Sequence, residues 1–184
     1  MDLTGTSPKT LAVITGAYGG TGRAVARRLG ARYRLVLSGR DAQRVARLRE
    51  SLEEEGYDVA AAVTADIASR RGVEQLAAAT AGAGVLGTLV HTAGLSPVQA
   101  PWETVVAVNL TGTALLLDAF GPRAVSGSVA VCLGSSAAQS RPGCIGSGRA
   151  PSRDEGASPR RGRPAQIRTP RADKEGAGPG RSVE

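Results

Sequence analysis

The segment that most constrains the fold is the glycine-rich sequence TGAYGGTG at residues 15–22. A short apolar run rich in β-branched residues, TLAVIT at 10–15, precedes it and predicts a buried strand. The stretch that follows, 23–29, has apolar residues at helical spacing and predicts an amphipathic helix. A glycine loop between a strand and a helix is typical of phosphate-binding units, because the free N–H groups and the dipole of the helix N-terminus face the anion.

Three glycines of this loop have distinct expected tasks. Gly16 would allow the tight turn, Gly20 would let the backbone approach a pyrophosphate, and Gly22 would allow the helix to pack closely on the strand. A tight connection without a ligand is the alternative, but three glycines carry an entropic cost that a plain turn does not require.

The next part of the chain alternates strands and helices. Four more short apolar runs predict strands at 33–38, 58–63, 88–93 and 128–133. Between them, Asp41 and Ser69 are expected to cap two helices, and 101–120 predicts a long third helix. That helix is apolar almost all round, so we expect it to be buried on several sides. The alternation predicts an α/β fold with a doubly wound parallel sheet that binds a nucleotide.

The glycine spacing, Gly-x-x-x-Gly-x-Gly, resembles the cofactor loop of the short-chain dehydrogenase/reductase family, whose members have a Rossmann fold. Four further motifs resemble that family in order and spacing: Asp66-Ile67, HTAG at 91–94, VNLTGT at 108–113 and Ser135-Ser136. The resemblance covers about residues 9–138 and implies hydride transfer between a nicotinamide cofactor and a carbonyl or alcohol. The residues that it implies at the cofactor are Thr15, Gly16, Tyr18, Gly19, Gly20, Thr21, Gly22, Gly39, Arg40, Asp66, Ile67, Thr92, Ala93 and Gly94.

The end of the second predicted strand bears on the choice of cofactor. An enzyme that prefers NAD usually has an acid there for the ribose 2′-hydroxyl, but Ser38, Gly39 and Arg40 include none. Gly39 leaves room, and Arg40 can pair with a 2′-phosphate through two N–H groups, whereas Asp41 is better placed as a helix cap. We therefore expect NADP rather than NAD, and an Arg that is simply solvated at a strand end is the alternative.

The family's chemistry uses Asn, Ser, Tyr and Lys around the substrate oxygen. By resemblance Asn109 and Ser136 fill the first two roles, although Asn109 could instead bond to backbone and Ser136 could be a turn serine. Tyr and Lys should stand at 149 and 153, where both residues are Arg, and no Tyr occurs after Ser136. Arg does not deprotonate in proteins, so it cannot replace the phenol. We expect His91, which replaces the family's first Asn, to be a hydrogen-bonded strand-end histidine rather than a substitute acid.

From about residue 139 the composition changes. The segment 139–184 is dominated by Gly, Pro, Arg, Ala and Ser, has no Leu or aromatic residue, and carries most of the formal net charge of +7. It shows no apolar period, so we expect a disordered basic tail after a domain at 1–138 that is truncated after the fifth strand. Codons made only of G and C encode Gly, Ala, Pro and Arg, so a frameshift near 136–141 is one origin of this segment, and a genuine tail is the other.

Several other classes of protein do not fit. No run approaches the ~18–20 apolar residues of a membrane span, and the N-terminus does not resemble a secretory signal. Cys132 and Cys144 make neither a disulfide framework nor a metal site, so we expect no metal and a cytoplasmic location. The nearly neutral first 138 residues disfavour nucleic-acid binding, which the basic tail could support only weakly.

Two main functions stay open for the chain as it stands. One is an NADP-dependent oxidoreductase of a small carbonyl or alcohol, catalytically impaired because Tyr-x-x-x-Lys is absent. The other is a non-catalytic nucleotide-binding module. A homo-oligomer formed through the apolar helix at 101–120 is a further expectation.

Overall fold

The structure is a computed structural model of the chain, and it describes residues 10–135. The chain divides into two units, Met1–Ser140 and Arg141–Glu184, and all the described residues belong to the first. Three predictions lie outside the described residues: the catalytic role of Ser136, the domain boundary at 138, and the disordered tail at 139–184.

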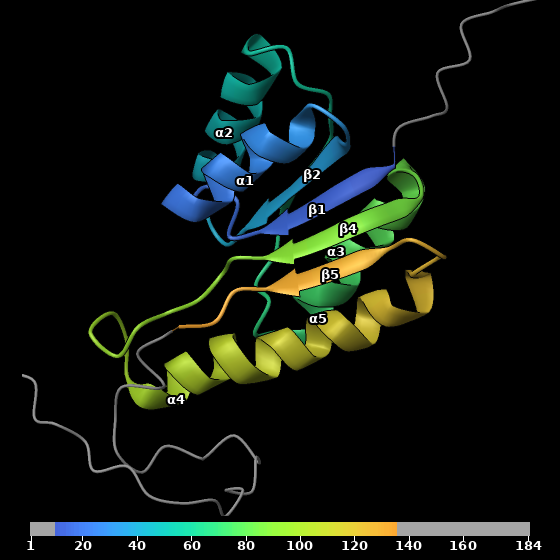
Figure 1. Cartoon of the computed structure of the whole chain (residues 1–184). Coiled ribbons are helices and arrows are strands. Elements are labelled where there is room, and N and C mark those ends of the chain that lie inside the picture. Colours follow the sequence, from blue (N-terminus) through green and yellow to red (C-terminus); the bar gives the residue numbers. More distant parts are fainter. Residues whose placement is uncertain (1–9, 136–184) are drawn as a thin grey trace, which may run out of the picture. The chain divides into compact units, whose positions relative to one another are not determined.

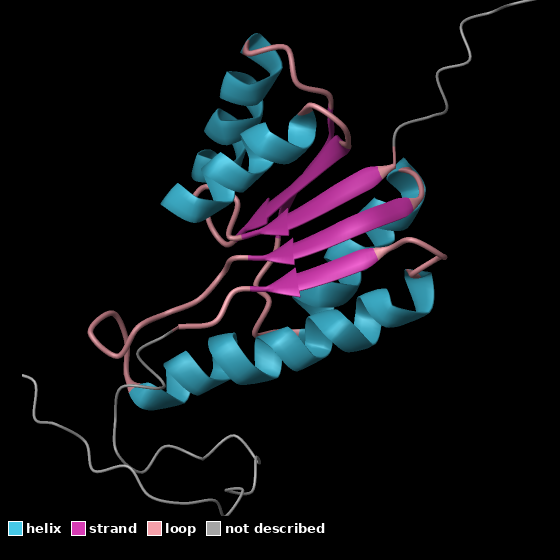
Figure 2. Ribbon diagram, viewed as in Figure 1, coloured by secondary structure: helices cyan, strands magenta, loops and turns pink. Residues whose placement is uncertain are grey.

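Five parallel strands form the sheet, which Figure 2 shows between two layers of helices. In chain order they are β1 (Leu11–Thr15), β2 (Arg34–Gly39), β3 (Val59–Thr64), β4 (Leu86–His91) and β5 (Val129–Cys132). In space the order is β3-β2-β1-β4-β5, so the direction of winding reverses between β1 and β4. The topology confirms the predicted α/β fold with a doubly wound parallel sheet, and the strand ends differ from the predicted ones by a residue or two.

Helices cover both faces of this sheet (Figure 1). On one face lie α1 (Gly20–Gly30) and α2 (Ala42–Glu54). On the other face lie α3 (Arg70–Ala83) and a long helix made of α4 (Trp102–Val106), η1 (Ala107–Thr111) and α5 (Gly112–Phe120), which ends in the 3-10 turn η2 (Gly121–Arg123).

Both predicted helix caps are confirmed. Asp41 Oδ1 accepts a hydrogen bond from the Arg44 backbone N–H at 3.0 Å, at the start of α2. Ser69 Oγ accepts one from the Gly72 backbone N–H at 3.4 Å, at the start of α3. Each side chain satisfies an N–H group that the first turn of a helix leaves without an intrahelical partner.

Two apolar clusters fill the space between the sheet and its helices, one on each face. Beneath α1 and α2 the cluster includes Ala12, Ile14, Leu35, Leu37, Leu48 and Leu52. Beneath α3 and α5 it includes Val13, Val36, Leu76, Leu89, Leu116 and Phe120. Alternate residues of β1 and β2 therefore enter opposite clusters, as the pleat of a strand buried on both faces requires.

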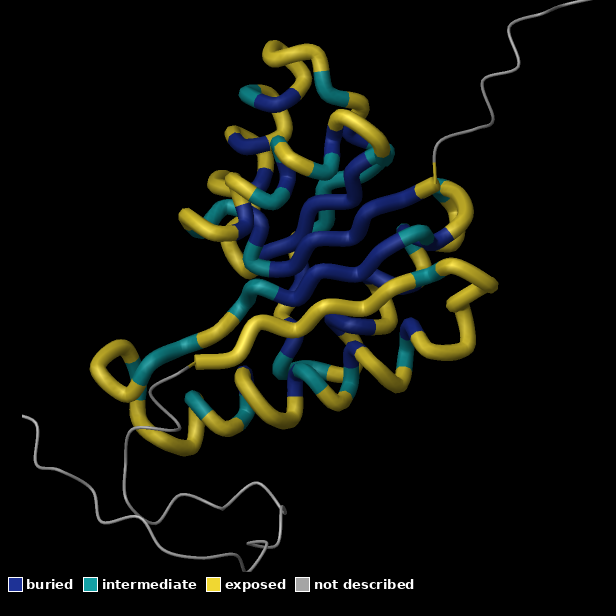
Figure 3. Tube along the Cα trace, viewed as in Figure 1, coloured by how far each residue is buried: buried dark blue, intermediate teal, exposed yellow. Residues whose placement is uncertain are grey.

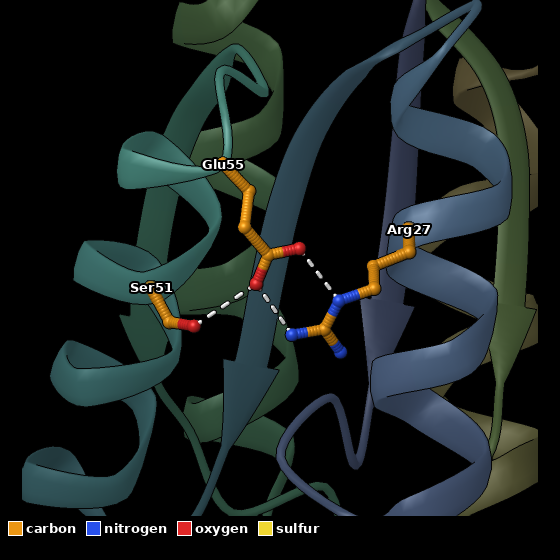
Figure 4. Close-up of polar contacts among 3 residues, drawn as sticks. All are labelled: Arg27, Ser51 and Glu55. Atoms are coloured by element: carbon orange, nitrogen blue, oxygen red, sulfur yellow. Dashed lines mark hydrogen bonds and ion pairs between the residues drawn. The ribbon is translucent and has the colours of Figure 1, made fainter.

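An ion pair links α1 to the end of α2 (Figure 4). Arg27 Nε donates to Glu55 Oε2 at 2.7 Å, its Nη2 reaches Oε1 at 2.5 Å, and Ser51 Oγ donates to Oε1 at 3.1 Å. The hydrogen bonds lower the pKa of the Glu55 carboxyl and raise the pKa of Arg27. Water reaches both side chains and screens the pair, so it contributes little to stability.

The long helix is present, but its expected burial on several sides is wrong for the residues that the structure describes. One stripe packs on the sheet, formed by Val108, Gly112, Leu116 and Phe120. Other positions leave large apolar side chains exposed, at Trp102, Val106, Leu110 and Leu117. The expected burial fails because the apolar residues of the helix outnumber the positions that the sheet covers.

The same helix bears on the expectation that no apolar run approaches the length of a membrane span. By length and mean hydropathy alone, Trp102–Arg123 is long and apolar enough to cross a membrane, although Glu103, Asp118 and Arg123 interrupt its apolar residues. A core helix passes the same test, and one side of this helix packs on the sheet through Val108 and Leu116.

β5 is an edge strand in the part of the chain that the structure describes. It pairs with β4, and all four of its residues are exposed, whereas all five residues of β1 are buried (Figure 3). The side chains of Val129 and Val131 are 56% and 46% exposed. The sheet is therefore covered unevenly from β1 to β5.

Candidate cofactor site

A cavity of about 290 Å³ lies at the carboxyl ends of the strands, where the direction of winding reverses. Ligands of open α/β sheets bind in this crevice. Its walls come from the glycine loop, the ends of β2 and β3, and the segment after β4. The lining residues are Gly16, Tyr18, Gly19, Ser38, Gly39, Arg40, Arg44, Ala65, Ile67, Thr92, Ala93, Gly94, Leu95, Gln99 and Val108.

The glycine loop passes directly against neighbouring backbone. Gly16 has a φ of +67°, in the region that favours glycine, and a Cβ there would lie 2.6 Å from the Ala93 backbone nitrogen. A Cβ on Gly22 would run into the carbonyl oxygen of Gly16. The turn expected at Gly16 and the close packing expected at Gly22 are therefore both present.

The N-terminus of α1 is open to an anion. Gly19 caps it without a side-chain hydrogen bond, and the first turn contains no acidic residue. A Cβ built on Gly20 would meet nothing within 4 Å, so there is room beside this stretch of backbone. Space, N–H groups and the positive end of the helix dipole fit the expected approach of a pyrophosphate.

The end of β2 forms a polar wall of the cavity. Ser38 is fully buried, and its Oγ has no hydrogen-bond partner among the described residues. A Cβ on Gly39 would run into the ring of Tyr18, so the ring lies directly against this strand end. Arg40 and Arg44 take part in none of the ion pairs found within residues 10–135. A buried hydroxyl without a partner and two arginines without a carboxylate fit an anionic ligand.

The segments after β3 and β4 complete the cavity. Thr92 Oγ1 donates to the carbonyl oxygen of Thr15 at 2.8 Å and so ties the end of β4 to the start of the glycine loop. Ile67 is 3% exposed and lines the cavity, which fits an apolar contact with a base. Asp66 Oδ1 accepts from the Ala68 backbone N–H at 3.0 Å, so this carboxylate shapes the turn before α3.

His91, at the carboxyl end of β4, is buried and bonded through both ring nitrogens. The Thr113 hydroxyl donates to the Asn109 carbonyl oxygen at 2.7 Å, so it accepts from His91 Nε2 at 3.0 Å. His91 Nδ1 then accepts from Thr15 Oγ1 at 2.6 Å. Burial lowers the pKa of His91, which keeps the ring neutral in this tautomer. The expectation of a hydrogen-bonded strand-end histidine is confirmed.

Asn109 lies in the π-helical turn η1 and uses both ends of its amide on the segment after β4. Its Oδ1 accepts from the Leu95 backbone N–H, and its Nδ2 donates to the Leu95 carbonyl oxygen, both at 2.8 Å. Asn109 therefore bonds to backbone, which is the alternative to a catalytic role that the sequence left open. It fixes the loop that carries Ala93 and Gly94, and a role toward a substrate stays a prediction.

The cavity brings together part of the predicted cofactor set. The predicted residues that line it are Gly16, Tyr18, Gly19, Gly39, Arg40, Ile67, Thr92, Ala93 and Gly94. Those that adjoin it in sequence without lining it are Thr15, Gly20, Thr21, Gly22 and Asp66. Contacts of either group with a cofactor stay predictions.

Sequence reasoning missed six of the lining residues: Ser38, Arg44, Ala65, Leu95, Gln99 and Val108. A signal for Ser38 exists in the sequence, because it directly precedes Gly39 and Arg40 at the carboxyl end of the strand predicted at 33–38. Arg44 lies in the first turn of the helix that Asp41 caps, only a few residues after this strand end, so its position in the sequence also indicates that it could line the cavity.

Comparisons with known proteins identify the family of the chain. The short chain dehydrogenase family matches residues 10–145. A protein of Streptomyces violaceoruber, whose name describes it as a ketoacyl reductase of the granaticin polyketide synthase, is 38% identical over 122 residues, 61% of this chain. The human mitochondrial dehydrogenase/reductase SDR family member 2 is 34% identical over 154 residues, 77% of this chain. This chain spans 44% and 54% of the lengths of those two relatives.

Solved structures with the same architecture carry either nicotinamide cofactor. A short-chain dehydrogenase/reductase from Burkholderia phymatum in complex with NAD is 29% identical, with a TM-score of 0.66 over 75% of this chain and 53% of that one. A variant of the actinorhodin polyketide ketoreductase with NADPH is 28% identical, with a TM-score of 0.62 over 74% of this chain and 57% of that one.

Proposed function

Because the chain belongs to the short chain dehydrogenase family, we propose that its cavity binds NADPH in preference to NADH, for hydride transfer with a small carbonyl or alcohol. The end of β2 carries this proposal. Arg40 lines the cavity there and Gly39 leaves space. The Asp41 carboxylate accepts a hydrogen bond from the Arg44 backbone N–H and so caps α2. A ribose 2′-hydroxyl therefore lacks the acid that would bind it, whereas a 2′-phosphate would meet a guanidinium.

The chain's own residues would hold the two ends of the cofactor differently. The N-terminus of α1 would bind the pyrophosphate through backbone N–H groups, and Ile67 would contact the adenine. Thr92, Ala93 and Gly94 line the cavity beside the glycine loop. The names of the Streptomyces relative and of the actinorhodin enzyme support ketones as the substrate class.

We further propose that turnover by this chain is impaired. Bound NADPH would supply a hydride to the carbonyl carbon, and the protein would have to deliver a proton to the carbonyl oxygen. Residues 149 and 153, where the family has Tyr and Lys, are Arg, and a guanidinium does not give up its proton. Loss of general acid catalysis typically costs about 10²–10⁴-fold in rate.

Binding of the two cofactors by the full chain tests the first proposal. NADPH and NADH are titrated by fluorescence against the wild-type protein, Arg40→Ala and Arg47→Ala. Arg47 is exposed on α2 and lies outside the cavity, so its variant matches the change in charge. We expect NADPH to bind at least tenfold tighter than NADH, and Arg40→Ala to remove most of that difference. Equal affinities in the wild type would contradict the NADPH preference.

A non-catalytic nucleotide-binding module is the second candidate, and the absence of Tyr-x-x-x-Lys favours it. Both ends of the Asn109 amide bond to Leu95, a structural task that is compatible with either candidate. Steady-state oxidation of NADPH with a panel of ketones and aldehydes separates the candidates. Tight NADPH binding without measurable turnover would support the module, and slow but measurable turnover would support the impaired oxidoreductase. Turnover at a rate usual for enzymes, about 1–10³ s⁻¹, would contradict both the module and the proposed impairment.

A further inference from the structure

Arg44 stands beside Arg40 at the end of β2, although it belongs to a different element. It lies in the first turn of α2, and its backbone N–H donates to Asp41 Oδ1 at 3.0 Å. Its side chain reaches back to the cavity, where it lines the same wall as Gly39 and Arg40. The two guanidinium groups therefore border one space from two elements.

The ring of Tyr18 holds Arg44 in this position. The guanidinium carbon of Arg44 lies 4.2 Å from the centre of the Tyr18 ring, within the range of a cation–π contact. The ring also lies against Gly39, where an added Cβ would overlap it. Tyr18 thus lies between the strand end and the guanidinium of Arg44. Its ring reduces the number of rotamers that the long Arg44 side chain can sample.

The charges around Arg44 are not balanced by the described residues. Arg27, Arg34 and Arg49 each pair with a carboxylate, whereas the ion pairs within residues 10–135 include neither Arg40 nor Arg44. The nearest acid in sequence, Asp41, accepts a hydrogen bond from the Arg44 backbone N–H as the cap of α2. Two arginines without an ion-pair partner among the described residues therefore line one cavity wall.

Ser38 supplies an independent sign that a ligand belongs in this space. Ser38 lines the same cavity, its side chain is fully buried, and its hydroxyl has no partner among the described residues. A buried hydroxyl without a partner costs free energy unless a ligand or water satisfies it.

We propose that Arg44 is a second arginine for the 2′-phosphate of the cofactor, and that Tyr18 is the residue that positions it. The inference rests on the proposed NADPH binding and names a further determinant of that preference. A phosphomonoester carries close to two negative charges near neutral pH, and the guanidinium groups of Arg40, just after β2, and Arg44, in the first turn of α2, match that charge. Arg40 alone would match half of it.

Fragments of the cofactor test this inference on the full chain. Binding of adenosine 2′,5′-bisphosphate and of adenosine 5′-monophosphate is measured by calorimetry for the wild type, Arg44→Ala and Arg47→Ala. We expect Arg44→Ala to weaken the bisphosphate about tenfold and to leave the monophosphate unchanged, with Arg47→Ala close to the wild type. The effect should shrink at high salt, because an exposed guanidinium is screened.

Two variants of Tyr18 separate positioning from direct binding. Tyr18→Leu removes the ring, and we expect it to weaken the bisphosphate nearly as much as Arg44→Ala, with little further loss in the double variant. Tyr18→Phe keeps the ring and should recover most of the affinity that Tyr18→Leu loses. Independent, additive losses would contradict the positioning role. A fold check by circular dichroism accompanies each variant.

The remaining outcomes are distinct. Equal losses for both fragments in Arg44→Ala would mean that Arg44 contacts the adenine or the 5′-phosphate, and the assignment would be wrong. No loss in Arg44→Ala, with a wild type that still prefers the bisphosphate, would overturn the role of Arg44 and leave the proposed NADPH preference intact. A wild type that does not distinguish the two fragments would overturn both.

Discussion

The two halves of the sheet differ in how completely the described residues cover them. In the first half, residues 11–64, β1 and β2 are central, and five of the six residues of β2 are buried. In the second half, residues 86–132, five of the six residues of β4 are buried as well, but β5 is exposed along its length. An apolar groove of about 160 Å³ between β5 and α5 includes Leu117, Phe120 and Val129.

This difference shows which part of the sheet is covered by helices that are close to it in the chain and which part is not. The first half closes on itself, because α1 and α2 follow their strands directly and pack on them. It also holds the glycine loop and both arginines of the cavity. The second half presents apolar side chains that the described residues do not cover. The glycine loop and the wall that carries the two arginines are therefore built by segments close together in the chain, whereas residues 92–95, Gln99 and Val108 are contributed by the second half.

The largest expected change in stability comes from comparing a substitution in the central strand β2 with one in the exposed strand β5. Leu35→Ala should lower the free energy of unfolding by about 2–5 kcal/mol, because Leu35 is fully buried between β2 and the helices. Val131→Ala, at a residue that is 46% exposed on β5, should lower it by less than about 1 kcal/mol. Urea unfolding of the full chain, followed by circular dichroism, measures both. Equal losses would mean that β5 is as well covered as β2.

The glycine loop allows stability to be separated from binding. Gly16→Ala should cost about 1–3 kcal/mol, because of its positive φ and the contact with Ala93. Gly20→Ala meets no neighbour within 4 Å, so it should leave stability nearly unchanged while it weakens NADPH through loss of space for the phosphates. Thermal unfolding and fluorescence titration check the pair. Unchanged NADPH binding by Gly20→Ala would contradict the proposal that the pyrophosphate binds beside Gly20.

His91, at the carboxyl end of β4, should make the free energy of unfolding depend on pH. Its folded pKa lies below the usual 6.5, so the unfolded chain binds the proton more readily. Stability should be fully present above about pH 6.5 and fall as the pH decreases towards the folded pKa, by at most about 1.4 kcal/mol per pH unit. Urea unfolding between pH 5 and 8 should show this slope in the wild type, and His91→Asn should lack it. An identical slope in both proteins would assign it to other groups.

The smallest effect belongs to the surface of the first half. The pKa of Glu55 is lowered by its hydrogen bonds with Arg27, so its contribution is present above about pH 4.5 and is lost as the pH falls through the folded pKa. Glu55→Gln should shift the thermal midpoint slightly at pH 7 and low salt, and not at high salt. Glu54→Gln, at an exposed carboxylate with no ion pair among residues 10–135, is the matched control. A large, salt-independent loss would contradict the exposed character of the pair.

Local patterns in the sequence determined the alternation of strands and helices, the caps at Asp41 and Ser69, and the turn at Gly16. These features depend on residues close together in the chain, where spacing, side-chain oxygens and the absence of a Cβ act directly. For the same reason Gly39 and Arg40 could be assigned to the end of β2 from their place after an apolar run.

Tertiary contacts decided the rest. Which side of the helix at 101–120 is buried depends on the sheet that it meets, and its apolar residues alone do not select a face. Ser38 and Arg44 enter the cavity because β2, α2 and the ring of Tyr18 converge there. The tautomer of His91 is set by Thr15 and Thr113, which lie 76 and 22 residues away. Such contacts join positions far apart in the chain, and only the packed sheet brings them within hydrogen-bonding distance.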